Sequence, residues 1–122
     1  MTTPARAAAD TYRESVNTKD LALLRTIFAK DVVLQVPTMA MTLKNPDGVF
    51  HGIDEAMDFF ASTSFPAQAI LTYTHIYETE DSCVVELQGR LPAGNSVEAL
   101  DIFTVGDEGL VTRMAVYARI AS

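Results

Sequence analysis

An acidic residue stands inside an apolar stretch near the end of the chain. Asp101 lies in residues 97–105, Val-Glu-Ala-Leu-Asp-Ile-Phe-Thr-Val, which otherwise have the composition of a buried β-strand. Aspartate is rare in strands, and a carboxylate among apolar side chains costs free energy unless it is hydrogen-bonded or protonated. A protonated carboxyl can donate a hydrogen bond to a carbonyl or a developing oxyanion. Asp101 is therefore the first candidate catalytic residue; the alternative is that it only organises the core.

The direction of the Asp101 side chain follows from the hairpin that contains it. Residues 106–109, Gly-Asp-Glu-Gly, separate two strand patterns, and if Val105 pairs with Leu110, Asp101 lies opposite Met114. Side chains alternate between the faces of a strand. The more apolar face, expected to point inward, comprises Val97, Ala99, Asp101, Phe103, Thr112, Met114, Val116 and Ala118. A bulge that shifts the register by one residue would turn Asp101 outward.

Tyr12 is the second candidate. It lies on the apolar stripe of a helix predicted over residues 4–17, after the capping pair Thr3 and Pro4. Its hydroxyl can point into the same interior and act as a second hydrogen-bond donor beside Asp101, or it can be a core group with its own partner. Both interpretations stay open at this point.

The two histidines are weaker candidates. His75 shares a strand face with Tyr73 and Tyr77 by simple alternation, and it is a possible base only if that face is the inner one. His51 follows a turn and is expected in solvent. The histidines are 24 residues apart with no Cys or carboxylate at ligand spacing, so no metal site is expected. No glycine-rich phosphate loop or nucleophile elbow is present, and no organic cofactor is implied.

The order of elements predicts an α+β fold. Helices are expected over residues 4–17, from 21 to about 29 or 30 after the cap Asp20, and from 54 onward, and a short strand over 31–37 ends at Pro37. The remaining strands are predicted over residues 69–78, 82–90, 97–105 and 110–120. Three N-terminal helices packed on a curved, mostly antiparallel sheet form a cone-shaped α+β barrel, whose mouth is a natural ligand site.

Three segments in this order resemble the nuclear transport factor two-like superfamily, which includes SnoaL-like polyketide cyclases and ketosteroid isomerases. They are residues 12–37, residues 50–60 beginning Phe-His-Gly-Ile-Asp, and the hairpin from Asp101-Ile102-Phe103 to Met114. The resemblance implies that a helix-one tyrosine and a protonated aspartic acid polarise a substrate carbonyl, while a second aspartate before the first proline of the sheet moves the proton. Tyr12 and Asp101 match the first two. Val36 occupies the third position, so the isomerase mechanism does not carry over intact.

The sequence therefore predicts a SnoaL-like domain that binds a small hydrophobic molecule. If it is an enzyme, an isomerase or cyclase using general acid-base chemistry on a carbonyl-containing ring compound is implied. The alternative is a non-catalytic ligand-binding or dimerisation module of the same fold. The residues expected to line the ligand pocket are Val36, Met39, Phe59, Phe60, Val85, Leu87, Phe103, Met114 and Val116.

The charge and composition of the chain argue against some classes of binding partner, nucleic acid first among them. The 122 residues read as one domain, 1–122, with a net charge of -7 and nine scattered Lys and Arg residues, so nucleic acid is not an expected partner. No apolar run is long enough to span a membrane, no signal peptide is evident, and the single Cys83 fits a reducing compartment, so we expect a cytoplasmic protein.

The outer sheet face carries an apolar strip that predicts a homodimer. The strip consists of Leu100, Ile102, Ala115 and Tyr117, flanked by Glu98, Arg113 and Arg119.

Overall fold

The computed structural model describes residues 2–37, 47–67, 70–90, 94 and 96–121. Its helical elements are α1 (Pro4–Thr18), α2 (Leu21–Arg25), α3 (Ile53–Phe59), the π-helix η2 (Phe60–Ser64) and α4 (Phe65–Ala67). Its strands are β1 (Phe28–Gln35), β2 (Val49–His51), β3 (Ile70–Glu78), β4 (Ser82–Arg90), β5 (Ser96–Val105) and β6 (Val111–Ala121). The element order is thus helices first and long strands last, as predicted.

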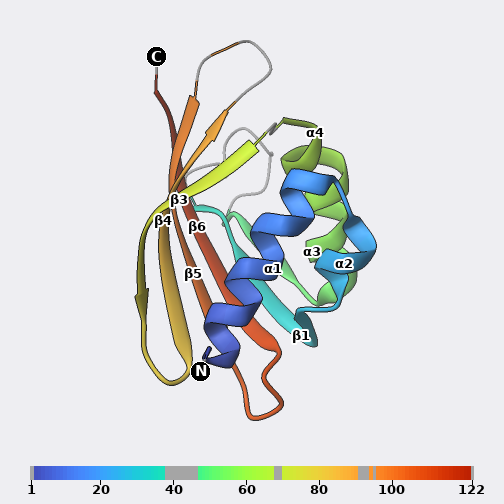
Figure 1. The fold of residues 1–122 in the computed structure, drawn as a ribbon. Coiled ribbons are helices and arrows are strands. Elements are labelled where there is room, and N and C mark those ends of the chain that lie inside the picture. The colour runs from blue at the N-terminus through green and yellow to red at the C-terminus, as the bar shows by residue number, and fades with distance from the viewer. Residues whose placement is uncertain (1, 38–46, 68–69, 91–93, 95, 122) are drawn as a thin grey trace.

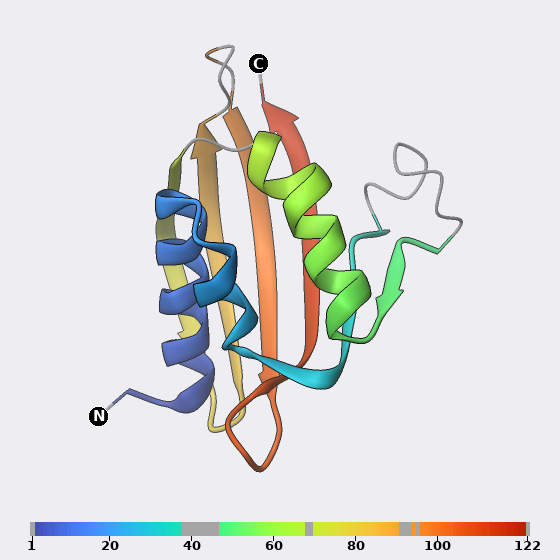
Figure 2. The same cartoon turned by 90° about the vertical axis from the view of Figure 1, so that its right-hand side faces the viewer.

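The strands form one curved sheet with all the helices on one side (Figures 1 and 2). The strand order is β2-β1-β6-β5-β4-β3. The pairings are antiparallel except for β1 with β6, which is parallel. Helix α1 lies over the β3 and β4 side of the sheet, and the continuous α3, η2 and α4 segment lies over the β6 and β1 side (Figure 2). This is the predicted α+β architecture of helices on a curved, mostly antiparallel sheet.

Helix α1 begins where the sequence predicts. The Thr3 side chain accepts a hydrogen bond from the Arg6 N–H at 3.2 Å, and Pro4 occupies the first turn, where its missing N–H costs nothing. The helix ends at Lys19, whose backbone is left-handed with φ 58°. Its buried face contains mostly small residues, which lets the helix backbone approach the sheet closely. These buried residues are Ala5, Ala8, Ala9, Tyr12, Ser15 and Val16.

The second helix is shorter than predicted. Asp20 caps it as expected, accepting from the Leu23 N–H at 3.0 Å, but the helix ends at Arg25 and strand β1 begins at Phe28. The reason is tertiary: Phe28 pairs with Val111 of β6, and the Val111 N–H donates to the Ile27 carbonyl at 2.8 Å. Backbone pairing with a distant strand therefore overrides the apolar helical spacing of this segment. The short strand β2, which no pattern indicated, pairs with the other edge of β1.

The third helix, predicted to follow a cap at Asp54, begins earlier, at Ile53, with Gly52 at the cap position. It continues without a break into η2, where the hydrogen bonds widen to the π-helical pattern. Phe59 and Phe60 lie at this junction, and both are buried. The change of helical pitch directs both neighbouring aromatic rings into the interior.

The β5–β6 hairpin differs from the predicted register. Asp101 pairs with Val116, and Phe103 pairs with Met114. Val105 pairs with Val111, one residue beyond the predicted Leu110, and a bulge between Thr104 and Val105 adds one more residue of shift. The difference from the predicted pairing is two residues, so the inward direction of Asp101 is preserved. At the hairpin end, however, Thr112 is exposed where an inward side chain was predicted.

Candidate functional site

Asp101 is the buried acidic residue at the centre of the site. It lies on β5 between Val85 of β4 and Val116 of β6, and it is 2% exposed. Its Oδ1 atom is buried and has no hydrogen-bond partner in the part of the chain that the structure describes. Burial raises the pKa of the Asp101 carboxyl to about 7, because the charged form loses its hydration. Near neutral pH, a substantial fraction of this carboxyl is a protonated hydrogen-bond donor.

Tyr12 lies on the buried face of α1 and is 3% exposed. Its ring packs edge-on against Phe60, with ring centroids 5.9 Å apart, and against Phe103, with centroids 5.5 Å apart. Phe103 is two residues from Asp101 and shares its face of β5. The structure therefore places both sequence-predicted candidates in the interior between α1 and the sheet.

The predicted pocket residues that the structure describes belong to one hydrophobic core, together with Tyr12. Val36, Val85, Phe103 and Met114 are 0% exposed, and Phe59, Phe60 and Leu87 are also buried. Val116 is partly buried and packs against the same core. Met39 lies outside the described residues. This core is apolar, and the burial of Asp101 within it deprives the carboxyl of water.

Val36 occupies the position where the family resemblance implied a proton-transferring carboxylate. It is fully buried just after β1, and its N–H donates to the Gly48 carbonyl at 2.7 Å. The adjacent Gln35 does not supply a replacement, because its side chain is bound on the outer face by the Arg113 guanidinium, with Nε 2.9 Å from Oε1. Neither residue brings a second carboxylate to Asp101.

His75 lies on the outer face of the sheet. Its Nδ1 is 3.0 Å from a carboxylate oxygen of Glu86, and its side chain is 63% exposed. Simple alternation would give His75 the same face as Tyr73, but a bulge between these two residues separates their faces. Tyr77 keeps the outer direction and stacks on the His75 ring with centroids 6.3 Å apart. His75 therefore does not replace the missing base.

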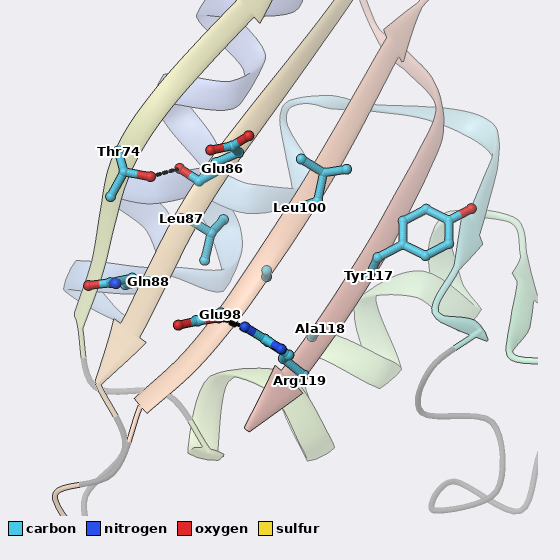
Figure 3. A pocket seen from close by; sticks show the side chains of 10 residues that line it. Thr74, Glu86, Leu87, Gln88, Glu98, Leu100, Tyr117, Ala118 and Arg119 are labelled. Carbon is cyan, nitrogen blue, oxygen red and sulfur yellow. Dashed lines mark hydrogen bonds and ion pairs between the residues drawn. The ribbon is translucent and has the colours of Figure 1, made fainter. Parts of the chain in front are cut away.

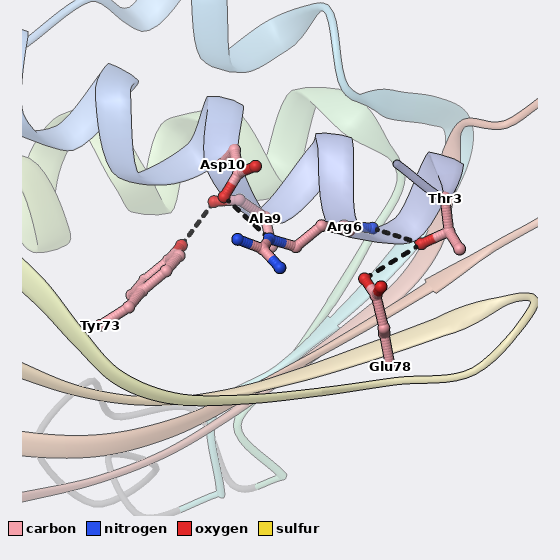
Figure 4. A network of polar contacts seen from close by, with 6 residues as sticks. All are labelled: Thr3, Arg6, Ala9, Asp10, Tyr73 and Glu78. Atoms are coloured by element: carbon pink, nitrogen blue, oxygen red, sulfur yellow. Dashed lines mark hydrogen bonds and ion pairs between the residues drawn. The ribbon is translucent and has the colours of Figure 1, made fainter. Parts of the chain in front are cut away.

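Tyr73 is partly buried against the core, whereas simple alternation placed it on one strand face with His75 and Tyr77. Its hydroxyl donates a hydrogen bond to the Ala9 carbonyl of α1, as Figure 4 shows. Burial, followed by the proximity of Tyr12 and Asp101, raises the pKa of the Tyr73 phenol, so it stays protonated. Only the bulge turns it inward, and a single extra residue in a strand has no reliable sequence signal.

A separate hollow of about 490 Å³ lies on the opposite, outer face of the sheet (Figure 3). Leu100 and Tyr117, a cross-strand pair of β5 and β6, line it, and so do Glu98 and Arg119, whose Nε atom lies 2.9 Å from a Glu98 carboxylate oxygen. The hollow is open, and neither Asp101 nor Tyr12 lines it. It shares Leu100 and Tyr117 with the apolar strip of the outer face, and Tyr117 is 42% exposed. The polar side chains of Thr74, Glu86 and Gln88 also line it.

The described residues lack two features that would indicate other kinds of function. Within residues 2–37, 47–67, 70–90, 94 and 96–121, no group of three His, Cys, Asp or Glu side chains is arranged to hold a metal ion. Across these same ranges, no helix has both the length and the apolar character needed to cross a membrane. The polar side chains buried or partly buried in the described interior include the Asp101 carboxyl, the Tyr12 and Tyr73 phenols, the Cys83 thiol and the Ser15 and Ser64 hydroxyls.

Comparison with known proteins gives a consistent result. Residues 9–114 match the model of the SnoaL-like domain family. The fold is similar to that of a putative ketosteroid isomerase from Kribbella flavida, with a TM-score of 0.79 and 21% identity over 98% of this chain and 80% of that chain. It is also similar to Delta 5-3-ketosteroid isomerase from Mycobacterium sp., with a TM-score of 0.76 and 20% identity over 98% of this chain and 100% of that chain.

A third similar structure was solved with a ligand. It is RV0760c from Mycobacterium tuberculosis in complex with estradiol-17beta-hemisuccinate, with a TM-score of 0.76 and 22% identity over 94% of this chain and 93% of that chain. No curated protein matches the chain. At these identities, the similarity to solved structures establishes the fold and leaves the activity to be argued from the residues.

Proposed function

The chain belongs to the SnoaL-like domain family, within the nuclear transport factor two-like superfamily, and we propose that it binds a small hydrophobic molecule through the interior around Asp101. The observation that carries this proposal is the buried Oδ1 atom of Asp101, which has no hydrogen-bond partner among the described residues. A buried polar atom without a partner destabilises a fold, so its presence in an otherwise apolar wall calls for a functional explanation. A ligand oxygen that meets the carboxyl would supply the missing partner.

The chemistry of the site defines the ligand class. The wall is apolar and aromatic, which favours a ring system of low polarity. Protonated Asp101 can donate to one oxygen on that ring, and the Tyr12 phenol is the candidate second donor. The steroid ester bound by RV0760c has this combination of an apolar ring system and oxygen groups, which supports the choice of class.

If the ligand is turned over, the reaction is general acid-base chemistry of the isomerase or cyclase type. Asp101 would then stabilise negative charge on a carbonyl oxygen by donating its hydrogen bond, and Tyr12 would share that task. The carbon-bound proton needs a separate acceptor, and neither Val36 nor Gln35 can provide one. A substrate that carries its own basic group is the kind that this site suits as an enzyme.

Val36 favours a second candidate function, a ligand-binding module without turnover. In that case the domain holds its ligand through the same donors and releases it unchanged. The two candidates predict the same binding and differ only in whether product appears. Turnover by the wild-type protein that Asp101→Asn abolishes, with affinity unchanged, would favour the enzyme.

The experiment is a thermal-shift screen with estradiol-17β-hemisuccinate and a panel of steroids, polyketide intermediates and terpenoids. A ligand at 100 times its dissociation constant stabilises the fold by about 2.7 kcal/mol, which raises the melting temperature measurably. We expect Asp101→Leu to weaken binding of a hit roughly tenfold, since one buried hydrogen bond is lost. Asp58→Asn, at an exposed position on α3, is the matched control. No stabilisation by any panel member would contradict the proposal.

We also propose that the outer sheet face forms a two-fold homodimer. Exposed Tyr117 with partly buried Leu100 and Ile102 makes an apolar strip of the kind that subunits cover, and the open hollow beside it adds polar and charged groups that can pair across an interface. Light scattering should give twice the chain mass, and Tyr117→Asp should shift it to the monomer mass. Ser62→Asp, on the exposed side of η2, should leave the dimer intact. A monomeric wild-type protein would contradict this proposal.

A further inference from the structure

Helix α1 is attached to the edge strand β3 by hydrogen bonds at two points along its length, besides the longer, exposed contact of its N-cap Thr3 with Glu78 at 3.4 Å. In the middle of the helix, the Tyr73 hydroxyl donates to the Ala9 carbonyl (Figure 4). At its end, the Asn17 amide bonds both backbone groups of Leu71, with distances of 2.7 Å from the Leu71 N–H and 3.2 Å to its carbonyl. These contacts fix both the rotation of the helix and its position along the strand.

Tyr73 is well placed to control the helix. The bulge in β3 turns its side chain away from His75 and toward the interior. The Arg13 guanidinium carbon lies 4.8 Å from the Tyr73 ring centre, so the ring is held between the strand and the helix. Its hydroxyl therefore has a defined direction, toward the backbone of α1.

The position of Ala9 determines the position of Tyr12. Ala9, Tyr12 and Arg13 lie on neighbouring turns of one helical face, because residues three and four apart are adjacent on a helix. The rise of about 1.5 Å per residue puts Tyr12 about 4.5 Å along the axis from Ala9. Tyr12 in turn packs on Phe103, two residues from Asp101. A hydrogen bond at Ala9 is thus connected through one turn of helix and one ring contact to the site.

We propose that Tyr73 is a positioning residue, which holds α1 so that Tyr12 closes the interior over Asp101 and keeps water away from the carboxyl. Tyr73 acts here through the helix backbone. It is distinct from Tyr12 and Asp101, the groups proposed to meet the ligand. The ligand-affinity part of the inference rests on the proposed function, whereas the effect on Asp101 itself does not.

The electrostatic surroundings agree with this role. The groups that influence Tyr73 are Tyr12, Asp101, Arg13 and Asp10, and burial is the largest cause of its raised pKa. The phenol thus remains a hydrogen-bond donor throughout the neutral range. Its hydrogen bond to Ala9 does not depend on pH in that range, so a pH effect seen in a Tyr73 variant has to arise at another group.

The test is the Tyr73→Phe variant, which removes one hydroxyl and keeps the ring. Carbon-13 NMR of labelled aspartate measures the titration of Asp101 without any ligand. We expect the Asp101 pKa to fall by roughly one unit in Tyr73→Phe, because the loosened helix admits water to the carboxyl. Tyr77→Phe removes a hydroxyl from the exposed outer side of the same strand and should leave the titration unchanged.

A control variant must separate general destabilisation of the fold from displacement of helix α1. Val32→Ala shortens a core side chain on β1, which β6, β5 and β4 separate from β3, so it destabilises the fold without touching the contact with α1. The Val32→Ala variant should leave the pKa of Asp101 unchanged. Asn17→Ala, which removes the other attachment of α1, should shift the Asp101 titration in the same direction as Tyr73→Phe and offers the test a second variant.

The outcomes distinguish this inference from the proposed function. A shift of Asp101 in Tyr73→Phe and not in Tyr77→Phe or Val32→Ala supports positioning, even if estradiol-17β-hemisuccinate does not bind. If that probe binds, its affinity should fall about threefold to tenfold in Tyr73→Phe. An Asp101 titration unchanged in Tyr73→Phe, or shifted equally in Val32→Ala, would overturn the inference while leaving ligand binding untouched.

Discussion

The Tyr12 ring packs edge-on against Phe103 with ring centroids 5.5 Å apart, and this contact closes helix α1 over the strand that carries Asp101. Phe60 of η2, in the same helical layer as α1, contacts the same tyrosine with centroids 5.9 Å apart. Three aromatic side chains from three elements thus pack together two residues along β5 from the buried carboxyl. Since burial is the cause of the raised Asp101 pKa, this packing links the core of the fold to the chemistry of the site.

The stability of the protein should depend on pH through Asp101. The native pKa is about 7, against 3.8 for an ordinary aspartate, so between these pH values the folded state holds a proton that the unfolded state has released. The free energy of unfolding therefore decreases as pH rises from about 4 to about 7, by about 4 kcal/mol from this group, and levels off above the native pKa.

The Asp101→Asn variant checks this dependence, because asparagine does not titrate. We expect the stability of the variant relative to the wild type to rise with pH over that interval, as measured by urea denaturation at several pH values. Asp58→Asn, at an exposed position, should track the wild type. A constant difference between wild type and Asp101→Asn across the interval would show that the carboxyl has an ordinary pKa.

The Asn17→Ala variant should destabilise the fold by about 1–2 kcal/mol. Asn17 bonds both the N–H and the carbonyl of Leu71 at the edge of the sheet, and alanine leaves both backbone groups without this partner. Chemical denaturation measures the loss. Thr18→Ala is the neighbouring control, because its exposed hydroxyl bonds only the Glu14 carbonyl within the same helix. An equal effect of the two substitutions would mean that the contact with β3 contributes nothing.

The sequence predicted the direction of Asp101 because alternation places it on one face with Phe103, and a register error of two residues preserves that face. It wrongly put Tyr73 on one face with His75 and Tyr77, because the bulge before His75 changes the alternation within β3. The inward direction of Tyr73 is therefore the part of the site that could not be predicted, because it depends on an irregularity in strand β3.

The start of β1 was predicted wrongly for a related reason. Residues 26–30, Thr-Ile-Phe-Ala-Lys, fit the end of an amphipathic helix as well as the start of a strand. Pairing of Phe28 with Val111, more than eighty residues away in the sequence, decides between them. Local patterns hold no information about such a partner, whereas the caps Thr3 and Asp20 were predicted because capping depends only on neighbouring residues.

The close approach of Gly48 to Val36 gives the last prediction. Gly48 has φ +63°, and a Cβ atom there would lie 2.8 Å from the Val36 carbonyl oxygen. Gly94 has φ +97°, but a Cβ atom there would meet nothing within 4 Å. Alanine at either position adopts an unfavourable backbone conformation, at a cost of about 1–2 kcal/mol. Gly48→Ala should cost clearly more than Gly94→Ala, since it must also displace the Val36 backbone in the wall of the site. Urea denaturation of the two variants measures the difference, and equal losses would show that the backbone near Val36 moves freely.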